Sequence, residues 1–134
     1  MPNIKVNGIN LYFEWHGPRN APALVLNNGI FMNAATSWVF QTEPFSRHYR
    51  VLLYDCRGQG QSDHPLGPYS MALHAEDLAG LLTALGIERA HIAGISYGGE
   101  VAQAFVLQYP FVYLPCGIPF ILTPLSLYFI SLLL

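Results

Sequence analysis

The fold is decided by one stretch, residues 90–106, which reads Ala-His-Ile-Ala-Gly-Ile-Ser-Tyr-Gly-Gly-Glu-Val-Ala-Gln-Ala-Phe-Val. Its first six residues are mostly apolar and predict a buried parallel strand. From residue 97 to about residue 109 the apolar residues recur at helical spacing, and Pro110 ends the pattern. Between the two lies Gly94-Ile-Ser96-Tyr-Gly98, a GxSxG sequence whose specificity comes from its place between a strand and a helix.

A serine at such a strand-to-helix turn is typical of a catalytic nucleophile. The sequence predicts that Ser96 projects from a tight turn and that the backbone N–H of Tyr97, at the start of the helix, faces a developing oxyanion. The glycines Gly94, Gly98 and Gly99 are expected to be required because a side chain would clash with the neighbouring strand and helix. The alternative interpretation is an ordinary Gly-Ser turn.

The segments before this stretch alternate between strand and helix patterns. They are a hairpin over residues 4–13 around Asn7-Gly8, a buried strand at 23–27, a helix from about Trp38 to Phe45 capped by Thr36-Ser37, a strand at 50–55 and a helix from Ser70 to Gly86. We therefore expect an α/β class, with a mostly parallel sheet, an N-terminal antiparallel hairpin and flanking helices.

Two further motifs stand at the ends of the predicted strands. The run Asn27-Asn-Gly-Ile30 looks like an oxyanion loop, and the run 55–62, Asp-Cys-Arg-Gly-Gln-Gly-Gln-Ser, is similar to a DxRGxGxS turn. With the GxSxG sequence, and in this order, they resemble the α/β-hydrolase family over about residues 3–110. The resemblance implies an incomplete α/β-hydrolase fold that hydrolyses ester, lactone or similar acyl bonds through an acyl-enzyme on Ser96. The motifs look somewhat like the oxoadipate enol-lactonase branch.

The resemblance also implies roles for residues outside the GxSxG sequence. The amide of Ile30 becomes the second oxyanion donor, although Asn28-Gly29 departs from the His-Gly found in many members. The DxRGxGxS turn at residues 55–62 is expected to organise the loop beside the active site and to take no part in the chemistry. Its residues are Asp55, Arg57, Gly58, Gly60 and Ser62.

The general base that a serine nucleophile needs is harder to place. In the family the acid and the histidine follow the nucleophile, but after Ser96 this sequence has one carboxylate, Glu100, and no histidine. The five histidines are expected at a helix-strand junction (His48), in loops (His16, His64), on a helix (His74) and in a strand (His91), as surface or strand residues. His91 or His64 is the alternative base. We expect little or no hydrolase activity from the chain as written.

The end of the chain differs in character, because residues 101–134 contain no Asp, Glu, Lys, Arg or His. We divide the chain into residues 1–110, the N-terminal part of an α/β-hydrolase domain, and 111–134, an atypical uncharged apolar tail. The leading explanation of the tail is a truncated or frame-shifted reading of a longer gene. One alternative is a C-terminal membrane segment, against which its three prolines count. The other is that residues 111–114 form a sixth strand.

Composition narrows the classes of function. The chain has 134 residues, 52% of them apolar, and a formal charge of −2, which excludes nucleic acid as a partner. Cys56 and Cys116 are read as reduced thiols, since no spacing suits a metal site, and no metal or cofactor is expected. The N-terminus lacks a signal-peptide pattern, so the expected compartment is the cytoplasm. The expected partner is a small-molecule acyl substrate. Contact with a membrane is expected only through residues 111–134, and the sequence predicts no oligomeric state. The second hypothesis is a membrane-tethered or partner-completed binding module without catalysis.

Overall fold

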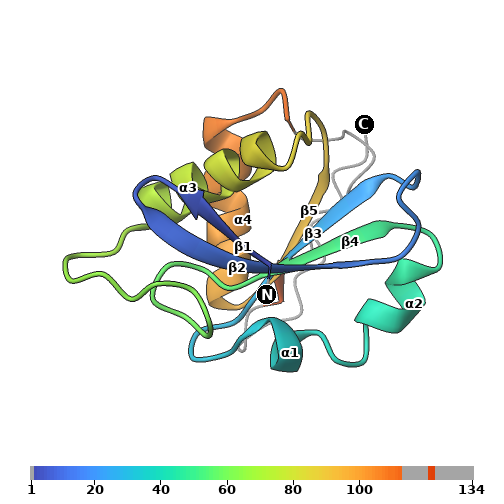
Figure 1. Cartoon of the computed structure of the whole chain (residues 1–134), viewed down its shortest axis with the longest axis horizontal. Helices are drawn as coiled ribbons and strands as arrows, with labels where there is room; N and C mark the ends of the chain where they lie inside the picture. The colour runs from blue at the N-terminus through green and yellow to red at the C-terminus, as the bar shows by residue number, and fades with distance from the viewer. Residues whose placement is uncertain (1, 113–120, 123–134) are drawn as a thin grey trace.

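The computed structural model describes residues 2–112 and 121–122, which form a sheet with helices on both faces (Figure 1). The strands are β1 (Asn3–Val6), β2 (Ile9–His16), β3 (Ala23–Asn27), β4 (Arg50–Tyr54), β5 (His91–Ile95) and β6 (Ile121–Leu122), in the order β1-β2-β4-β3-β5-β6. The pairs β3–β4, β3–β5 and β5–β6 are parallel, whereas β1–β2 and β2–β4 are antiparallel. The predicted α/β class with an N-terminal hairpin is confirmed.

The opening hairpin turns at two residues that both have positive φ. Asn7 has a φ of 48° and Gly8 a φ of 83°, which is the backbone of a two-residue type I′ turn. The register pairs Val6 with Ile9 across the turn. Asn and Gly tolerate this conformation better than other residues, so the hairpin follows directly from the local sequence.

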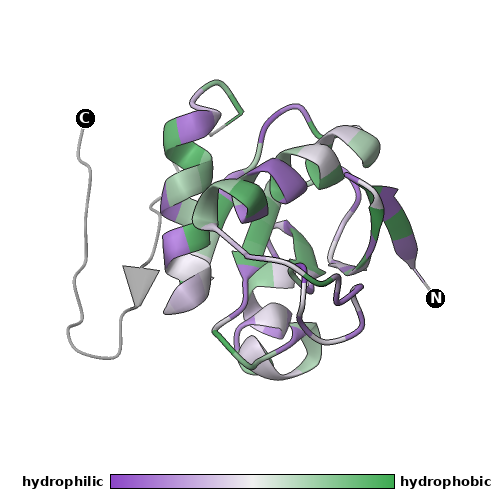
Figure 2. Cartoon of the chain, turned by 90° about the vertical axis from the view of Figure 1, so that its left-hand side faces the viewer, coloured by the Kyte–Doolittle hydropathy of each residue, from purple (hydrophilic) through white to green (hydrophobic). Residues whose placement is uncertain are grey.

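The helices are α1 (Ala34–Ser37), α2 (Thr42–Ser46), α3 (Met71–Ala84) and α4 (Tyr97–Gln108). Helices α3 and α4 lie on one face of the sheet, and α1 and α2 lie on the other (Figure 1). Both α3 and α4 are striped with apolar and polar residues (Figure 2), as expected of helices with one face on a core.

The central strands are buried on both faces, and alternate residues enter two separate cores. Val25, Leu52 and Ile92 pack in the core that contains the apolar residues of α3 and α4. Their neighbours Leu26, Leu53 and Ala93 pack in the core that contains Ala34 and Trp38. A strand between two cores needs apolar residues at nearly every position, which explains the continuous apolar runs in the sequence.

The predicted helix from about Trp38 to Phe45 is wrong, because the structure has two short helices in this region. The first begins earlier, since the Asn33 side chain accepts a hydrogen bond from Thr36 N at 3.1 Å and the Thr36 hydroxyl accepts one from Asn33 N at 3.3 Å. This reciprocal capping box starts α1 at Ala34. Trp38 then leaves the helical conformation, with its ring buried against the sheet, and α2 starts at Thr42.

Helix α3 begins and ends as its sequence predicts. The Ser70 hydroxyl accepts a hydrogen bond from Leu73 N at 3.1 Å. At the other end Gly86 has a φ of 69°, Gly86 N donates to Thr83 O at 3.1 Å and Ile87 N donates to Leu82 O at 2.9 Å. These two bonds are those of a Schellman motif, in which glycine takes the left-handed position.

The start of the tail is not a strand. Residues 111–112 form a turn, and the carbonyl of Val112 accepts a hydrogen bond from Ala90 N at 3.0 Å. The alternative that 111–114 form a sixth strand is therefore wrong for its first two residues, while 113–114 lie outside the described residues. On the side of β5 away from β3, the neighbouring strand is β6, with Gly94 opposite Ile121.

Most of the segment for which a membrane span was considered lies outside the described residues. Among the residues that the structure does describe, no helix combines the length and the apolar character needed to cross a membrane. The division of the chain at residue 110 and the frame-shift explanation of the tail stay predictions.

Candidate active site

Ser96 lies at a sharp bend between β5 and α4. Its backbone has a φ of 53° and a ψ of −120°, a region that residues other than glycine rarely adopt. The helix starts at the next residue, since the carbonyl of Ser96 accepts hydrogen bonds from Gly99 N at 2.8 Å and Glu100 N at 3.2 Å. Such strain persists only where the surrounding structure enforces it, and it is common at functional sites.

The glycines around Ser96 let three backbones pack closely. A Cβ atom on Gly94 would lie 2.1 Å from the carbonyl oxygen of Gly98, and one on Gly98 would lie 2.3 Å from the carbonyl oxygen of Asn27. Real Cβ atoms do not come this close to backbone. Gly99 is buried, and its N–H is one of the two donors to the Ser96 carbonyl. The bend at Ser96 therefore requires glycine at positions 94 and 98.

The predicted oxyanion loop lies beside this bend. Strands β3 and β5 are adjacent and parallel, with Asn27 opposite Gly94, so their carboxyl ends meet at one edge of the sheet. A Cβ atom on Gly29 would lie 3.7 Å from the carbonyl oxygen of Ile95, which places the loop against the residue before Ser96. The topology thus brings Ile30 and Tyr97 into one region.

A cavity of about 300 Å³ opens in front of this loop. It is lined by Ile30, Phe31, Met32, Asn33, Arg57, Gly58, Gln59, Gly60, Tyr69 and Tyr97. Both residues predicted to supply oxyanion amides are among them, whereas Ser96 is not. Its volume is at the lower end of the range for small-molecule sites.

Two buried asparagines hold the end of β3 in place. Asn27 donates to the carbonyl of Ala93 at 2.8 Å and accepts a hydrogen bond from the Tyr54 hydroxyl at 2.6 Å. Asn28 donates to the carbonyl of Tyr54 at 2.7 Å. These bonds tie β3 to both of its neighbours at the edge where the loop begins. These bonds are not among the sequence-based predictions, although two amides directly after a buried apolar strand are a signal of such bonds.

Asp55 joins the predicted oxyanion loop, α1 and its own turn. One carboxylate oxygen accepts hydrogen bonds from Ala34 N at 2.7 Å and Asn28 Nδ2 at 3.3 Å, and the other accepts one from Gln61 N at 2.8 Å. Burial raises the pKa of Asp55, and the amide donors of Gln61 and Ala34 act in the opposite direction. A Cβ atom on Gly60 would lie 2.1 Å from the carboxylate, so the turn closes tightly around it.

The other motif residues fasten this turn to the sheet. The Ser62 hydroxyl donates to the carbonyl of Asp55 at 2.5 Å and accepts from Tyr12 N at 2.9 Å. Gly58 has a φ of 76°, and a Cβ atom there would overlap the ring of Tyr69. These contacts position the loop between β4 and the cavity.

Arg57 is held in a buried ion pair with α3. Its Nε lies 2.7 Å from Asp77 Oδ2 and its Nη2 lies 2.8 Å from Asp77 Oδ1, with side chains that are 10% and 2% exposed. Asn7 of the hairpin turn donates to the same carboxylate at 3.1 Å. The bidentate pair raises the pKa of Arg57, against the opposing effect of burial. Asp77 could not be predicted as the partner of Arg57, because in the sequence it resembles any acidic residue on a helix.

His74 is buried, and the expectation that it lies on the surface is wrong. It is 2% exposed, and its Nε2 lies 2.6 Å from the hydroxyl of Tyr97. Its ring is edge-on to those of Tyr69 and Tyr97, with centroids 5.9 and 5.4 Å away. Burial lowers the pKa of His74. The signal for this burial was its spacing from Leu78 and Leu81, which puts it on the apolar face of α3.

The remaining histidines are not brought to Ser96. His16 is the last residue of β2, not part of a loop as expected, and lies 3.1 Å from Glu14. His91, at the start of β5, packs edge-on against Tyr49, and His64 lies 3.3 Å from the carbonyl of Gly60. Within residues 2–112 no histidine forms a hydrogen bond with Ser96. Neither His64 nor His91 is therefore positioned as the general base of Ser96.

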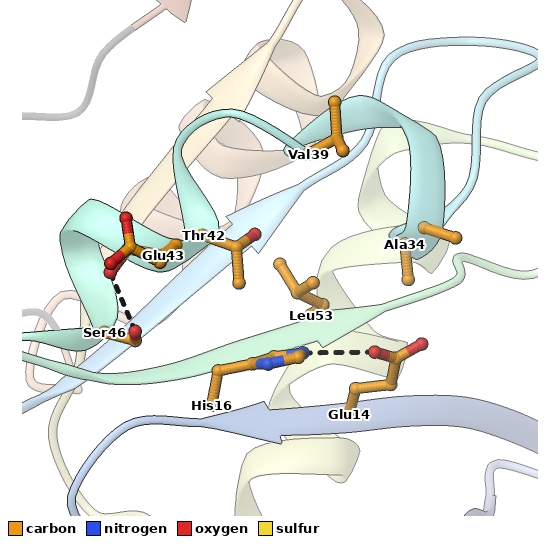
Figure 3. A pocket seen from close by; sticks show the side chains of 9 residues that line it. Glu14, His16, Ala34, Val39, Thr42, Glu43, Ser46 and Leu53 are labelled. Atoms are coloured by element: carbon orange, nitrogen blue, oxygen red, sulfur yellow. Dashed lines mark hydrogen bonds and ion pairs between the residues drawn. The ribbon is translucent and has the colours of Figure 1, made fainter.

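A second cavity, of about 350 Å³, lies between α1–α2 and β2–β4 (Figure 3). Its polar side chains include Glu14 and His16 from β2 and Glu43 from α2, and Leu53 supplies part of its apolar wall. None of residues 94–99 lines it. In the part of the chain that the structure describes, no group of three or more His, Cys, Asp or Glu side chains is arranged to hold a metal ion.

Comparison with known proteins matches this geometry to one family. The model of the alpha/beta hydrolase fold family matches residues 22–111. The 3-oxoadipate enol-lactonase 1 of Acinetobacter baylyi is 40% identical over 95 residues, which are 71% of this chain and 35% of that protein. RutD of Caulobacter sp. strain K31, named as a candidate carbamate hydrolase, is 36% identical over 102 residues, which are 75% of this chain and 38% of that protein.

Solved structures show the same fold. The crystal structure of the enol-lactonase from Burkholderia xenovorans LB400 superposes with a TM-score of 0.81 at 37% sequence identity, over 84% of this chain and 44% of that one. The chain thus spans less than half the length of these relatives. The chain belongs to the α/β-hydrolase fold family, and the three relatives described above are named as hydrolases.

Proposed function

We propose that Ser96 is the nucleophile of a hydrolase that cleaves ester, lactone or similar acyl bonds in a small-molecule substrate through an acyl-enzyme. The single observation that carries the proposal is the backbone of Ser96, with its φ of 53° at the junction of β5 and α4. A strained serine at the carboxyl end of a parallel strand, followed at once by a helix, is the geometry of a nucleophile elbow.

The chemistry assigns one role to each group. Ser96 Oγ attacks the carbonyl carbon, and the carbonyl oxygen becomes an oxyanion that the backbone N–H groups of Ile30 and Tyr97 stabilise. The intermediate collapses, and the leaving group departs with the proton that the serine lost. Water then attacks the acyl-serine, which releases the carboxylic acid and returns the proton to Ser96. Gly94, Gly98 and Gly99 shape the turn for this step.

The names of the relatives support acyl-bond chemistry. An enol-lactonase opens a cyclic ester, and a carbamate hydrolase cleaves a carbonyl bond to nitrogen or oxygen; both reactions pass through a tetrahedral oxyanion. Asp55, Arg57, Gly58, Gly60 and Ser62 take no part in bond making; they hold the loop that carries Ile30.

The general base is the missing component of the 134-residue polypeptide. Family order would place it after Ser96, where this sequence has no histidine. His64, His74 and His91 are each engaged with other groups. Loss of the triad histidine costs a serine hydrolase on the order of 10⁶ in turnover. We therefore expect turnover by this polypeptide to be close to the background rate.

Chemical rescue tests the proposal without the missing group. The full 134-residue polypeptide is incubated with p-nitrophenyl acetate at increasing imidazole concentration, and the Ser96→Ala variant is treated identically. Because free imidazole can remove the serine proton, the wild-type chain is expected to release nitrophenolate faster than the variant, and to carry an acetyl group on Ser96 by peptide mass spectrometry. Equal rates for both proteins, with no acetylated Ser96, would show that Ser96 is not a nucleophile.

A further inference from the structure

A buried histidine lies behind the wall of the 300 Å³ cavity, between two tyrosines that line it. Tyr69 and Tyr97 are partly exposed and line the cavity, whereas His74 does not line it and is 2% exposed. The imidazole is edge-on to both tyrosine rings, at interplanar angles of 74° and 83°. His74 can therefore set the position of side chains that a ligand in the cavity would touch, although the ligand would not touch His74.

The two tyrosines differ in how they are held. The Tyr97 hydroxyl lies 2.6 Å from His74 Nε2, whereas the Tyr69 hydroxyl donates to the carbonyl of Pro65 at 2.8 Å. The second side-chain dihedral angle of a tyrosine has a broad energy minimum, so packing alone leaves the ring some freedom. A hydrogen bond at the far end of the side chain removes this freedom. His74 thus fixes the direction of the Tyr97 side chain but not that of Tyr69.

The place of Tyr97 in the chain makes its direction important. It directly follows Ser96, and its backbone N–H is one of the two proposed oxyanion donors. Its side chain therefore leaves the backbone next to the proposed reacting centre. A change in the direction of this side chain would change the shape of the cavity where the acyl group of a substrate would lie.

The rest of the cavity wall favours an uncharged ligand. Of the described residues that line the cavity, only Arg57 is charged, and its charge is paired with that of Asp77. The apolar lining residues are Ile30, Phe31 and Met32. Such a wall, with its polar side chains engaged within the protein, fits an apolar aryl or alkyl group.

We propose that His74 is a positioning residue of the hydrolase site. Its hydrogen bond holds the Tyr97 side chain in the cavity wall, and the wall so fixed sets the affinity for the uncharged apolar part of an acyl substrate, such as a phenyl group. This inference rests on the proposed function, because it takes the cavity as the place where the acyl substrate binds.

Binding of phenyl acetate, an uncharged aryl ester, tests this inference. The full 134-residue chain carries Ser96→Ala in every arm, so that it cannot be acylated at this position, and the dissociation constant is measured by NMR titration. In this background Tyr97→Phe keeps the ring and removes the hydroxyl. It is expected to weaken binding roughly fivefold, the effect of losing one hydrogen bond.

Two substitutions at position 74 separate positioning from packing. His74→Leu fills the buried site without a polar atom and is expected to weaken binding roughly fivefold as well. His74→Gln places an amide at about the reach of Nε2, where it can still bond the Tyr97 hydroxyl, and is expected to retain most of the affinity. Both variants remove the imidazole ring from the core, so a purely structural role would make them lose affinity alike.

A double-mutant cycle shows whether His74 acts through Tyr97. His74→Leu combined with Tyr97→Phe should weaken binding no more than either substitution alone, because both remove the same hydrogen bond. Tyr69→Phe is the matched control, since it makes the same change in a cavity tyrosine whose hydroxyl bonds Pro65. Its effect should multiply with that of His74→Leu.

Three results would overturn the proposal: unchanged affinity in Tyr97→Phe, equal losses in His74→Gln and His74→Leu, or effects of His74→Leu and Tyr97→Phe that multiply. The absence of saturable binding to the Ser96→Ala chain would overturn it too. If urea unfolding shows that His74→Leu does not fold, a loss in Tyr97→Phe with retention in His74→Gln is still required. Because no acylation is measured, these outcomes are independent of the imidazole rescue.

Discussion

The hydroxyl of Tyr97 and Nε2 of His74 lie 2.6 Å apart, with the two rings at 83° to each other. This bond joins α4 to α3 and anchors the residue that directly follows Ser96. Tyr97 lines the cavity while His74 lies behind it, buried and edge-on to both cavity tyrosines. The pair therefore couples the conformation of the elbow to the packing of two helices.

The pH dependence of stability should report on His74. Burial lowers its pKa in the folded protein below the ordinary value of 6.5, so the unfolded chain takes up a proton at a pH where the folded chain does not. The free energy of unfolding should therefore fall as the pH falls below about 6.5. The His74→Gln variant should lose part of this slope, by at most about 1.4 kcal/mol per pH unit.

Urea unfolding at a series of pH values between about 5 and 7.5 measures this slope, a window set by the ordinary histidine pKa. The exposed His48 provides the matched control, since His48→Gln removes one histidine without a buried partner. If His74→Gln and the wild-type chain lose stability equally on acidification, the buried neutral state of His74 is refuted.

The buried pair between Arg57 and Asp77 should matter far more than an exposed pair. Asp77→Ala leaves a buried guanidinium without its partner, for which the expected loss is about 3–5 kcal/mol of unfolding free energy. Glu43→Ala breaks the pair with Arg47, whose side chains are 70% and 67% exposed, and should cost about 0–1 kcal/mol. Denaturant titration compares the two variants, and similar losses would contradict the assignment of the buried pair.

Glycine at position 98 should be irreplaceable. Gly98→Ala places a Cβ atom 2.3 Å from the backbone of Asn27, where nothing can move without separating α4 from β3, and the loss is expected to exceed about 3 kcal/mol. Gly80→Ala is the helical comparison, because its Cβ atom would meet a side-chain methyl of Val6 at 2.4 Å and no backbone atom, so its loss is expected to be smaller. Thermal and urea unfolding of both variants measure the difference; equal stability would mean that the close approach at Gly98 is not real.

Cys56 should be inert in the folded protein. Burial is the main cause that raises the pKa of its thiol to about 12, so the reactive thiolate is scarce at neutral pH. Iodoacetamide at pH 7.5 is expected to leave Cys56 unmodified in buffer and to alkylate it in urea, as read by peptide mass spectrometry. Rapid labelling of Cys56 without denaturant would show that this part of the core opens.

Local sequence determined the elements and the elbow. The Asn7-Gly8 turn, the apolar strand runs, the Ser70 cap and the Gly86 stop each act through residues a few positions apart, so the backbone conformation follows from neighbours in the chain. The GxSxG sequence belongs to this class, because its meaning depends only on the strand before it and the helix after it. The predicted helix from Trp38 to Phe45 is wrong for an equally local reason: the helix cap is Asn33, not Thr36-Ser37.

Only the tertiary structure determined which polar groups pair with each other. Asn27 is hydrogen-bonded to Ala93, 66 residues away in the sequence. Arg57 is paired with Asp77, 20 residues away, and Tyr97 with His74, 23 residues away. Hydrophobic periodicity indicates which face of an element is buried, but it cannot indicate which polar group lies opposite, because strand order and helix packing set that.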